Sequence, residues 1–119
     1  MLNPYFDDER RKYQRVYASL PMQFREIGEF DKLPRDTITK DLSEGGVKFT
    51  SSKLVPVGNR LVINIGLEPQ TEGLRSVVKI VWAKKQHYSD NYELGCQFMN
   101  MEEDSKSRIA RFIAHQPPA

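Results

Sequence analysis

The sequence predicts a mostly β fold, a six-stranded antiparallel barrel followed by one C-terminal helix. Three observations carry this prediction. Apolar and polar residues alternate in several short segments, turn-forming residues separate these segments, and the apolar period lengthens near the C-terminus. Many short strands with regular turns are typical of small barrels. The 119 residues suffice for one domain with its own core.

The first strand is expected over residues 16–25, where every second residue from Val16 to Phe24 is apolar. A period of two indicates a strand with one buried face. Pro21 falls on the outward set. Because proline cannot donate to a strand ladder, it predicts an edge position or a bulge at this point.

Three shorter strands follow, separated by turn sequences. They are expected over residues 36–42, 47–49 and 61–65. In the first of them, Ile38 and Leu42 are expected to point inward, because residues an even number apart share a face.

The fifth strand, residues 74–85, is the longest, and both of its faces are partly apolar. One face would carry Val78, Ile80 and Trp82, and the other Val77, Val81 and Ala83. The pattern alone therefore does not assign the inner face. The sixth strand, residues 92–98, alternates clearly.

The helix is expected after residue 100. Asn100 and Glu103 have the spacing of a capping box. Ile109, Phe112 and Ile113 then form one apolar stripe, which is typical of a short amphipathic helix packed on a core.

Composition excludes several classes of protein. With 18 Lys and Arg against 16 Asp and Glu, the net charge is only +2, which disfavours a nucleic-acid-binding role. Cys96 is the only cysteine, so no internal disulfide or cysteine cage for a metal can form, and its place in the alternation predicts a buried thiol. No apolar run reaches bilayer length, and the N-terminus lacks a signal pattern, so a cytoplasmic protein without a membrane span is expected.

A basic segment, residues 10–15, precedes the first strand and contains Arg10, Arg11 and Arg15. Arginine presents a planar fork of donors that can grip guanine, clasp phosphate or stack on a base. Taken alone, such a cluster is more often a solvated basic face.

A second segment, residues 41–46, offers complementary groups. Asp41 and Ser43 are two apart and project to one face. The carboxylate can accept hydrogen bonds from the N1–H and N2 amino groups of guanine, and the hydroxyl can donate to phosphate. Gly45 and Gly46 permit positive φ and a close approach to the backbone. Taken alone, the segment is an ordinary Asx-type turn.

The two segments together resemble the signature of the PilZ domain family. Arg11 and Arg15 fill an Arg-x-x-x-Arg motif, and Asp41, Ser43 and Gly46 fill the Asp-x-Ser-x-x-Gly motif that follows it. Further features also match, namely the turn at Pro56 and Gly58, the tryptophan at Trp82, and the pattern Leu94-Gly95-x-x-Phe98. The resemblance covers residues 9–113, nearly the whole chain.

The resemblance implies a six-stranded barrel that binds cyclic di-GMP, with the arginine segment folding over the ligand and the glycine turn facing it. A basic residue at Arg10 tends to accompany two ligand molecules, so two are favoured here. The predicted site comprises Arg10, Arg11, Arg15, Asp41, Ser43, Gly45, Gly46 and Trp82. For Trp82, packing in the core or rim competes with a role in stacking on the ligand.

The domain is expected to span residues 10–115, after a lead-in at 1–9 and before a tail at 116–119. We expect a stand-alone cyclic di-GMP receptor that orders its arginine segment on binding and signals to an unidentified downstream protein. One alternative is a PilZ-like interaction adaptor for motility or pilus machinery that binds no nucleotide.

Another alternative is a barrel that binds single-stranded nucleic acid through residues such as Tyr13 and Tyr17. Its near-neutral charge counts against it. No enzymatic activity, cofactor or metal is expected, because the sequence has no nucleophile elbow, phosphate-binding loop or histidine-based acid–base set. His87 and His115 lack partners at metal-binding spacing and are expected at the surface.

Overall fold

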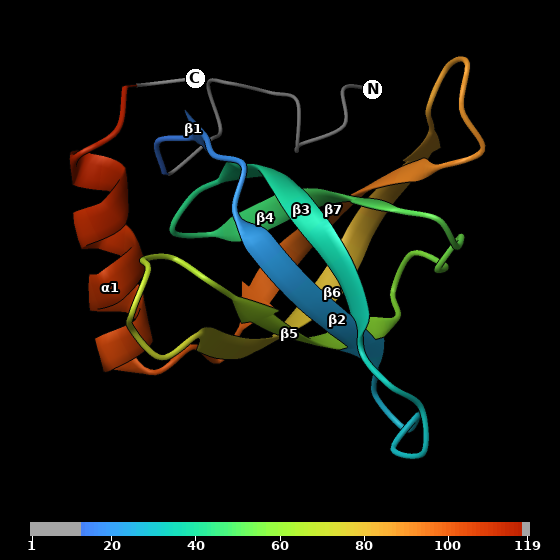
Figure 1. The fold of residues 1–119 in the computed structure, drawn as a ribbon, viewed down its shortest axis with the longest axis horizontal. Helices are drawn as coiled ribbons and strands as arrows, with labels where there is room; N and C mark the ends of the chain where they lie inside the picture. Colours follow the sequence, from blue (N-terminus) through green and yellow to red (C-terminus); the bar gives the residue numbers. More distant parts are fainter. Residues whose placement is uncertain (1–12, 118–119) are drawn as a thin grey trace.

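The computed structural model describes residues 13–117. The predicted lead-in, together with Arg10 and Arg11, lies outside this part of the chain. The described elements follow one another as β1 (Val16–Tyr17), β2 (Pro21–Glu26), β3 (Arg35–Leu42), β4 (Gly46–Ser51), β5 (Arg60–Ile65), β6 (Leu74–Lys85), β7 (Tyr92–Met99) and α1 (Glu103–Ala114) (Figure 1).

Six of these strands close into an antiparallel barrel. Their order is β3-β2-β5-β6-β7-β4, and β4 pairs again with β3 to complete the circle. The short β1 pairs with the far end of β3. Closure satisfies the backbone groups that an open sheet would leave at its edges. The predicted six-stranded barrel with a C-terminal helix is therefore confirmed, with β1 as one added strand.

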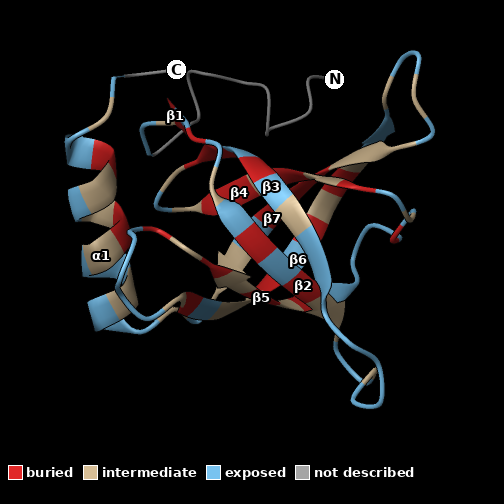
Figure 2. Cartoon of the chain, viewed as in Figure 1, coloured by how far each residue is buried: buried red, intermediate tan, exposed pale blue. Residues whose placement is uncertain are grey.

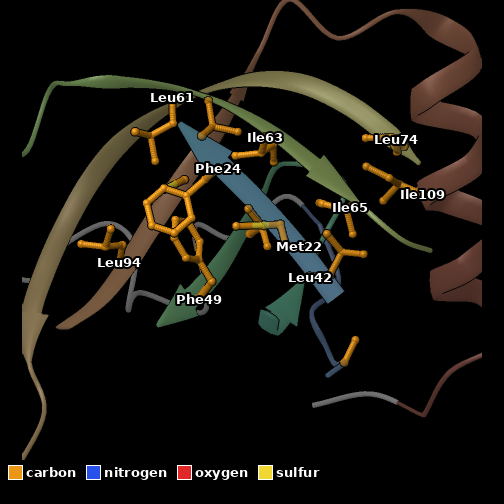
Figure 3. Packing of buried hydrophobic residues seen from close by; sticks show 14 of the residues in the cluster. Met22, Phe24, Leu42, Phe49, Leu61, Ile63, Ile65, Leu74, Leu94 and Ile109 are labelled. Atoms are coloured by element: carbon orange, nitrogen blue, oxygen red, sulfur yellow. The ribbon is translucent and has the colours of Figure 1, made fainter. Parts of the chain in front are cut away.

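The barrel interior holds a single apolar cluster, to which every strand contributes (Figures 2 and 3). The rings of Phe24 and Phe49 meet near its centre, with centroids 5.0 Å apart. Burial of each such side chain away from water stabilises the folded state by about 1.5–3 kcal/mol. Cys96 lies in the cluster, and burial raises the pKa of its thiol to about 12. The thiol therefore stays protonated, as expected of a structural cysteine.

The predicted first strand is interrupted. Its alternation is confirmed, but residues 18–20 leave the ladder and divide it into β1 and β2, both of which pair with β3. Pro21 is the first residue of β2, where a missing N–H is tolerated. Since β2 lies between β3 and β5, this proline is not on an edge strand, and the interruption next to it is the irregularity that the proline predicted.

Thr39 of β3 joins the two sides of this interruption. Its buried hydroxyl donates to the carbonyl oxygen of Ala18 and accepts from the backbone N–H of Leu20 at 2.9 Å. Its own N–H donates to the Leu20 carbonyl, also at 2.9 Å. One threonine thus satisfies backbone groups that the broken ladder leaves unpaired.

A bulge in β3 changes which residues face the core. Against β4, Thr39 pairs with Phe49 and Asp41 with Lys48, so Lys40 is an extra residue. An extra residue reverses the inward and outward sets. Ile38 is 56% exposed, so the expectation that it points inward was wrong. The predicted burial of Leu42 is correct.

A second bulge lies in β6. Ile80 pairs with Cys96 but Trp82 pairs with Gly95, so Val81 is the extra residue. Before the bulge, Val78 and Ile80 face the core, which assigns the inner face that the sequence left open. Beyond the bulge the faces are exchanged, and the expectation that Trp82 shares a face with Ile80 was wrong.

Helix α1 packs beside the barrel through Ile109 and Ile113, as the apolar stripe predicted. Figure 3 shows Ile109 at the end of the cluster near Leu74.

The predicted capping box is absent. Glu102 is the N-cap of the helix, and no side-chain hydrogen bond caps it. Asn100 instead has a φ of 47° in the turn that leaves β7. No helix in the described residues has the length and apolar character needed to cross a bilayer.

Candidate functional site

Four residues from four strands form a row on the outer face of the barrel. Asp41 of β3 is directly opposite Lys48 of β4, Lys48 is opposite Gly95 of β7, and Gly95 is opposite Trp82 of β6. Residues that oppose one another in a ladder share a face. Both chain neighbours of Gly95 are buried in the core, so the four residues, called here the outer row, point outward.

Asp41 begins the outer row with a carboxylate that is almost completely covered, the residue being 3% exposed. Its Oδ2 lies 2.9 Å from the Nζ of Lys48 and 3.9 Å from the Nη1 of Arg15. A carboxylate removed from water requires cations of this kind, because desolvation otherwise disfavours its charge. Arg15, from the basic segment, is thus brought to the predicted acceptor.

Lys48 also connects Asp41 to a second carboxylate. Its Nζ lies 3.8 Å from the Oε1 of Glu93, whose Oε2 is 2.9 Å from the Nζ of Lys40. Burial raises the pKa of Glu93, but the hydrogen bond from Lys40 and the charges of Lys40, Lys48 and Lys84 outweigh it, so this pKa lies below its usual value. The site therefore mixes anionic and cationic groups at short range.

Ser43 shapes the turn between β3 and β4. Its Oγ accepts hydrogen bonds from the N–H groups of Gly45 and Gly46, each at 3.1 Å, and its own N–H donates to the Gly46 carbonyl at 2.9 Å. The Gly45 carbonyl accepts from the N–H of Phe98 at 3.0 Å, which ties the turn to β7. The hydroxyl therefore acts as an acceptor within the turn and retains its proton for donation.

The two glycines of the turn are required for close contacts rather than for positive φ, which neither adopts. A Cβ at Gly46 would lie 2.1 Å from the Cys96 carbonyl oxygen. A Cβ at Gly45 would lie 2.9 Å from the ring of Tyr13. The expected use of positive φ was wrong. The groups that approach the two glycines are Tyr13 and β7, and the expected close approach of a ligand stays a prediction.

Trp82 ends the outer row, where its indole covers Gly95. A Cβ at Gly95 would lie 2.2 Å from the Nε1 of the indole, so only glycine leaves room for the ring. Trp82 is 7% exposed and is not part of the core cluster. Its place on the outer face excludes packing inside the barrel, the indole instead packs on Gly95, and a role in stacking on the ligand stays a prediction.

The structure thus brings Arg15, Asp41, the turn from Ser43 to Gly46, and Trp82 to one side of the barrel. Sequence reasoning missed Lys48 and Glu93. The polar position of Lys48 between two apolar residues was a signal that it points outward. Its pairing with both carboxylates depends on three strands coming together, which a single sequence does not reveal.

The chemistry of this surface is that of binding. It offers a carboxylate acceptor, a hydroxyl donor, arginine and lysine cations, and an indole. Within residues 13–117 no group of three or more potential metal ligands occurs. His87 and His115 are exposed, as expected.

A model of the PilZ domain matches residues 9–115. The chain belongs to the PilZ domain family. This match spans the residues of both segments that carry the predicted motifs.

Solved structures with the same fold include other PilZ proteins. The PilZ domain of YcgR from Escherichia coli with c-di-GMP is 17% identical, with a TM-score of 0.69 over 90% of this chain and 91% of that one. The Bacillus subtilis inhibitor of motility MotI/DgrA is 18% identical, with a TM-score of 0.72 over 87% of this chain. This PilZ chain covers only 48% of the Bacillus protein. The K. pneumonia MrkH complex with c-di-GMP is 14% identical, with a TM-score of 0.67 over 88% of this chain and 51% of that one. At these identities the likeness concerns the fold. The comparison with curated proteins gave no match.

Proposed function

We propose that this PilZ domain is a receptor for cyclic di-GMP and that the ligand lies along the outer row. The observation that carries the proposal is the convergence of Arg15, Asp41 and the Ser43 turn, three parts of the paired motifs, on one side of the barrel. The family and the c-di-GMP complexes among the structural relatives support the same ligand class.

Asp41 and Ser43 divide the recognition of the ligand between base and phosphate. The Asp41 carboxylate accepts hydrogen bonds from the N1–H and amino groups of guanine, an edge that adenine does not present. The Ser43 hydroxyl, whose acceptor capacity is used within the turn, donates to a phosphate oxygen. Hydrogen bonds of this kind that involve a charged partner are about twice as strong as neutral ones.

The arginines supply the cations for this dianionic ligand. Arg15 is next to Asp41, and Arg11 and Arg10 precede it in the basic segment. Each guanidinium can bind a phosphate through two parallel hydrogen bonds or lie flat on a guanine. Arg10 favours two ligand molecules over one in this proposal.

Lys48 and Trp82 complete the proposed surface. Guanine bound at Asp41 shares the carboxylate with Lys48, whose side chain is 18% exposed and whose ammonium adds positive charge for the phosphates. At the other end of the outer row, the indole edge of Trp82 provides apolar area against which a base or ribose can pack.

Signalling in this proposal depends on the basic segment becoming ordered over the ligand. Fixing the backbone of each residue costs about 1–2 kcal/mol of conformational entropy. The favourable free energy of the arginine contacts must therefore exceed the sum of these costs over the segment. The newly ordered segment would present a changed surface to a downstream protein in the cytoplasm.

Calorimetric titration of the full chain with cyclic di-GMP tests the proposal. Replacing Arg15 with alanine is expected to weaken binding by about tenfold or more, since it removes a charged contact worth at least about 1.4 kcal/mol. Asp41→Asn is expected to act similarly, because its amide can turn an N–H toward the donors of guanine. Higher salt should weaken binding to the unaltered protein, because it screens the attraction between the arginines and the phosphates.

Lys106→Ala serves as the matched control, since Lys106 is an exposed residue of α1 and should leave the affinity unchanged. Arg10→Ala is expected to lower the stoichiometry from two ligands to one. Absence of binding by a folded sample at tens of micromolar ligand would exclude the receptor role and leave the nucleotide-independent adaptor.

A further inference from the structure

The outer face of β5 and β6 carries an unfavourable arrangement of charge. Arg60 of β5 is directly opposite Lys79 of β6, and both are exposed. Like charges that oppose one another across strands destabilise a sheet. Within residues 13–117 neither residue belongs to an ion pair. The opposition of Arg60 and Lys79 therefore does not stabilise the sheet.

Two further arginines lie on the same face. Arg75 of β6 is opposite Asn64 of β5, and Arg25 of β2 is opposite Val62 of β5. No ion pair in the described chain includes either arginine. Four cations, Arg25, Arg60, Arg75 and Lys79, therefore occupy neighbouring positions, and we call them the basic face.

The centre of the basic face is apolar. Val62 and Val77 form a directly opposed pair between the two charged rows, and Val77 is in turn opposite Met99 of β7. All three side chains are partly exposed. An apolar centre surrounded by arginine and lysine has the anatomy of a protein interface, in which arginine is enriched.

A hollow of about 610 Å³ adjoins this apolar centre. Arg60, Val77 and Met99 line it from the barrel, and Arg108 lines it from α1. The guanidinium of Arg108 is held by a 2.7 Å hydrogen bond to the Glu72 carbonyl. The hollow gives a protruding side chain of a partner a place to enter beside the cations.

Exposed apolar residues extend the face toward the β2–β3 loop, which projects from the barrel (Figures 1 and 2). Phe30 is 80% exposed, and its ring centroid lies 5.9 Å from the guanidinium carbon of Arg25. Ile27, half exposed, lines the hollow next to Arg60. Aromatic and arginine side chains placed together are the residues that most often dominate binding energy at protein interfaces.

From these contacts we propose that the basic face is a docking surface for an acidic protein partner, one that presents carboxylates around an apolar side chain. The aliphatic centre favours a protein over a single-stranded nucleic acid, whose binding grooves combine positive charge with aromatic side chains on which the bases stack. Glu72 and Glu102 also line the hollow, and these carboxylates would repel the phosphates of a nucleic acid. The proposal stands on residues other than those of the outer row and does not require a nucleotide.

A titration of the isotope-labelled full chain, followed by NMR, tests this docking surface. The probe is a synthetic helical peptide with glutamate and leucine on one face. Controls are the same peptide with glutamine for glutamate, and an oligothymidine strand. We expect amide shifts centred on β5 and β6 with the glutamate peptide only. Equal shifts with the glutamine peptide, stronger binding of the oligonucleotide, or shifts centred elsewhere would overturn the proposal.

Charge reversal at Lys79 separates binding from folding. Lys79→Glu turns the repulsive pair with Arg60 into an attractive one, so the melting temperature should be equal or higher. Affinity for the glutamate peptide should fall by about tenfold.

Lys85→Glu is the control, since it makes the same charge change at the C-terminal end of β6, away from Arg60 and Arg75. It should retain most of the affinity, and an equal loss in both variants would contradict a localised face. Because Lys79→Glu leaves the outer row intact, its cyclic di-GMP titration should be unchanged, so failure of either proposal is distinguishable from failure of the other.

Discussion

The indole of Trp82 lies directly against the backbone of Gly95 on the neighbouring strand. A Cβ on that glycine would be 2.2 Å from Nε1 and 2.3 Å from Cε2 of the indole. The two residues oppose one another only because Val81 is bulged out of register. One extra residue in β6 thus moves the only tryptophan from the core side of the barrel to the side that carries Asp41.

Gly95→Ala should lower the free energy of unfolding by about 1–3 kcal/mol, because the ring must leave its position or the strands must shift. Urea unfolding measures the effect. In the same background, Trp82→Phe should recover part of the loss, since the smaller ring leaves room for the methyl group. An unchanged urea midpoint for Gly95→Ala would show that the indole is not held against the glycine.

The two glycines of the β3–β4 turn should respond differently to substitution by alanine. At Gly46 the new methyl group meets a backbone carbonyl at 2.1 Å, so the β4–β7 ladder must open. We expect a loss of about 3 kcal/mol or more, comparable to severe overpacking.

At Gly45 the methyl group comes too close only to the side chain of Tyr13, which can rotate away, and it is at an ordinary contact distance from the Ser43 hydroxyl. We expect a loss below about 1 kcal/mol there. Thermal unfolding of both variants gives the comparison. Equal losses would contradict the assignment of the backbone contact to Gly46 alone.

Thr39→Val should destabilise the fold by about 1–3 kcal/mol although the shape of the side chain is kept. Without the hydroxyl, the Leu20 N–H loses its partner and the Ala18 carbonyl loses a donor. Thr39→Ser retains the hydroxyl and should lose much less. Denaturant unfolding of the three proteins tests this, and equal stability of the valine and threonine forms would rule out the proposed role.

Glu93→Gln should make the free energy of unfolding depend less on pH in the acidic range. The pKa of Glu93 is lowered from 4.5 in the folded protein, so its contribution is complete above that value and is lost as pH falls through the folded pKa. The unfolding free energies of the two proteins should differ most near neutral pH and converge once the pH has fallen below the folded pKa of Glu93. A constant difference across the range would mean that Glu93 is not linked to acid unfolding.

Much of the fold was predictable because its strands obey a simple period. The alternation from Val16 to Phe24 indicated the correct buried set even though the strand is interrupted. The apolar stripe that includes Ile109 and Ile113 located the helix. In each case the residue pattern reflects one buried face, and that face is a property of the local segment.

The errors occurred where the period is broken. Ile38 does not point inward and Trp82 does not share a face with Ile80, because a bulge in each strand shifts the alternation of inward and outward residues. A bulge is determined by pairing with the neighbouring strand, which local alternation does not contain. Asn100 does not cap the helix as predicted, because its backbone, with a φ of 47°, forms part of the turn that leaves β7.

By itself the sequence determined the class of fold, the order of its strands and helix, and the motif positions Arg15, Asp41, Ser43 and Gly46. These depend on residue type, spacing and local period. Only the tertiary structure decided that Lys48 joins Asp41 to Glu93, that Trp82 faces outward, and that Arg60 meets Lys79. These relationships arise from register between strands distant in the chain, where one inserted residue reverses the face of every side chain that follows it.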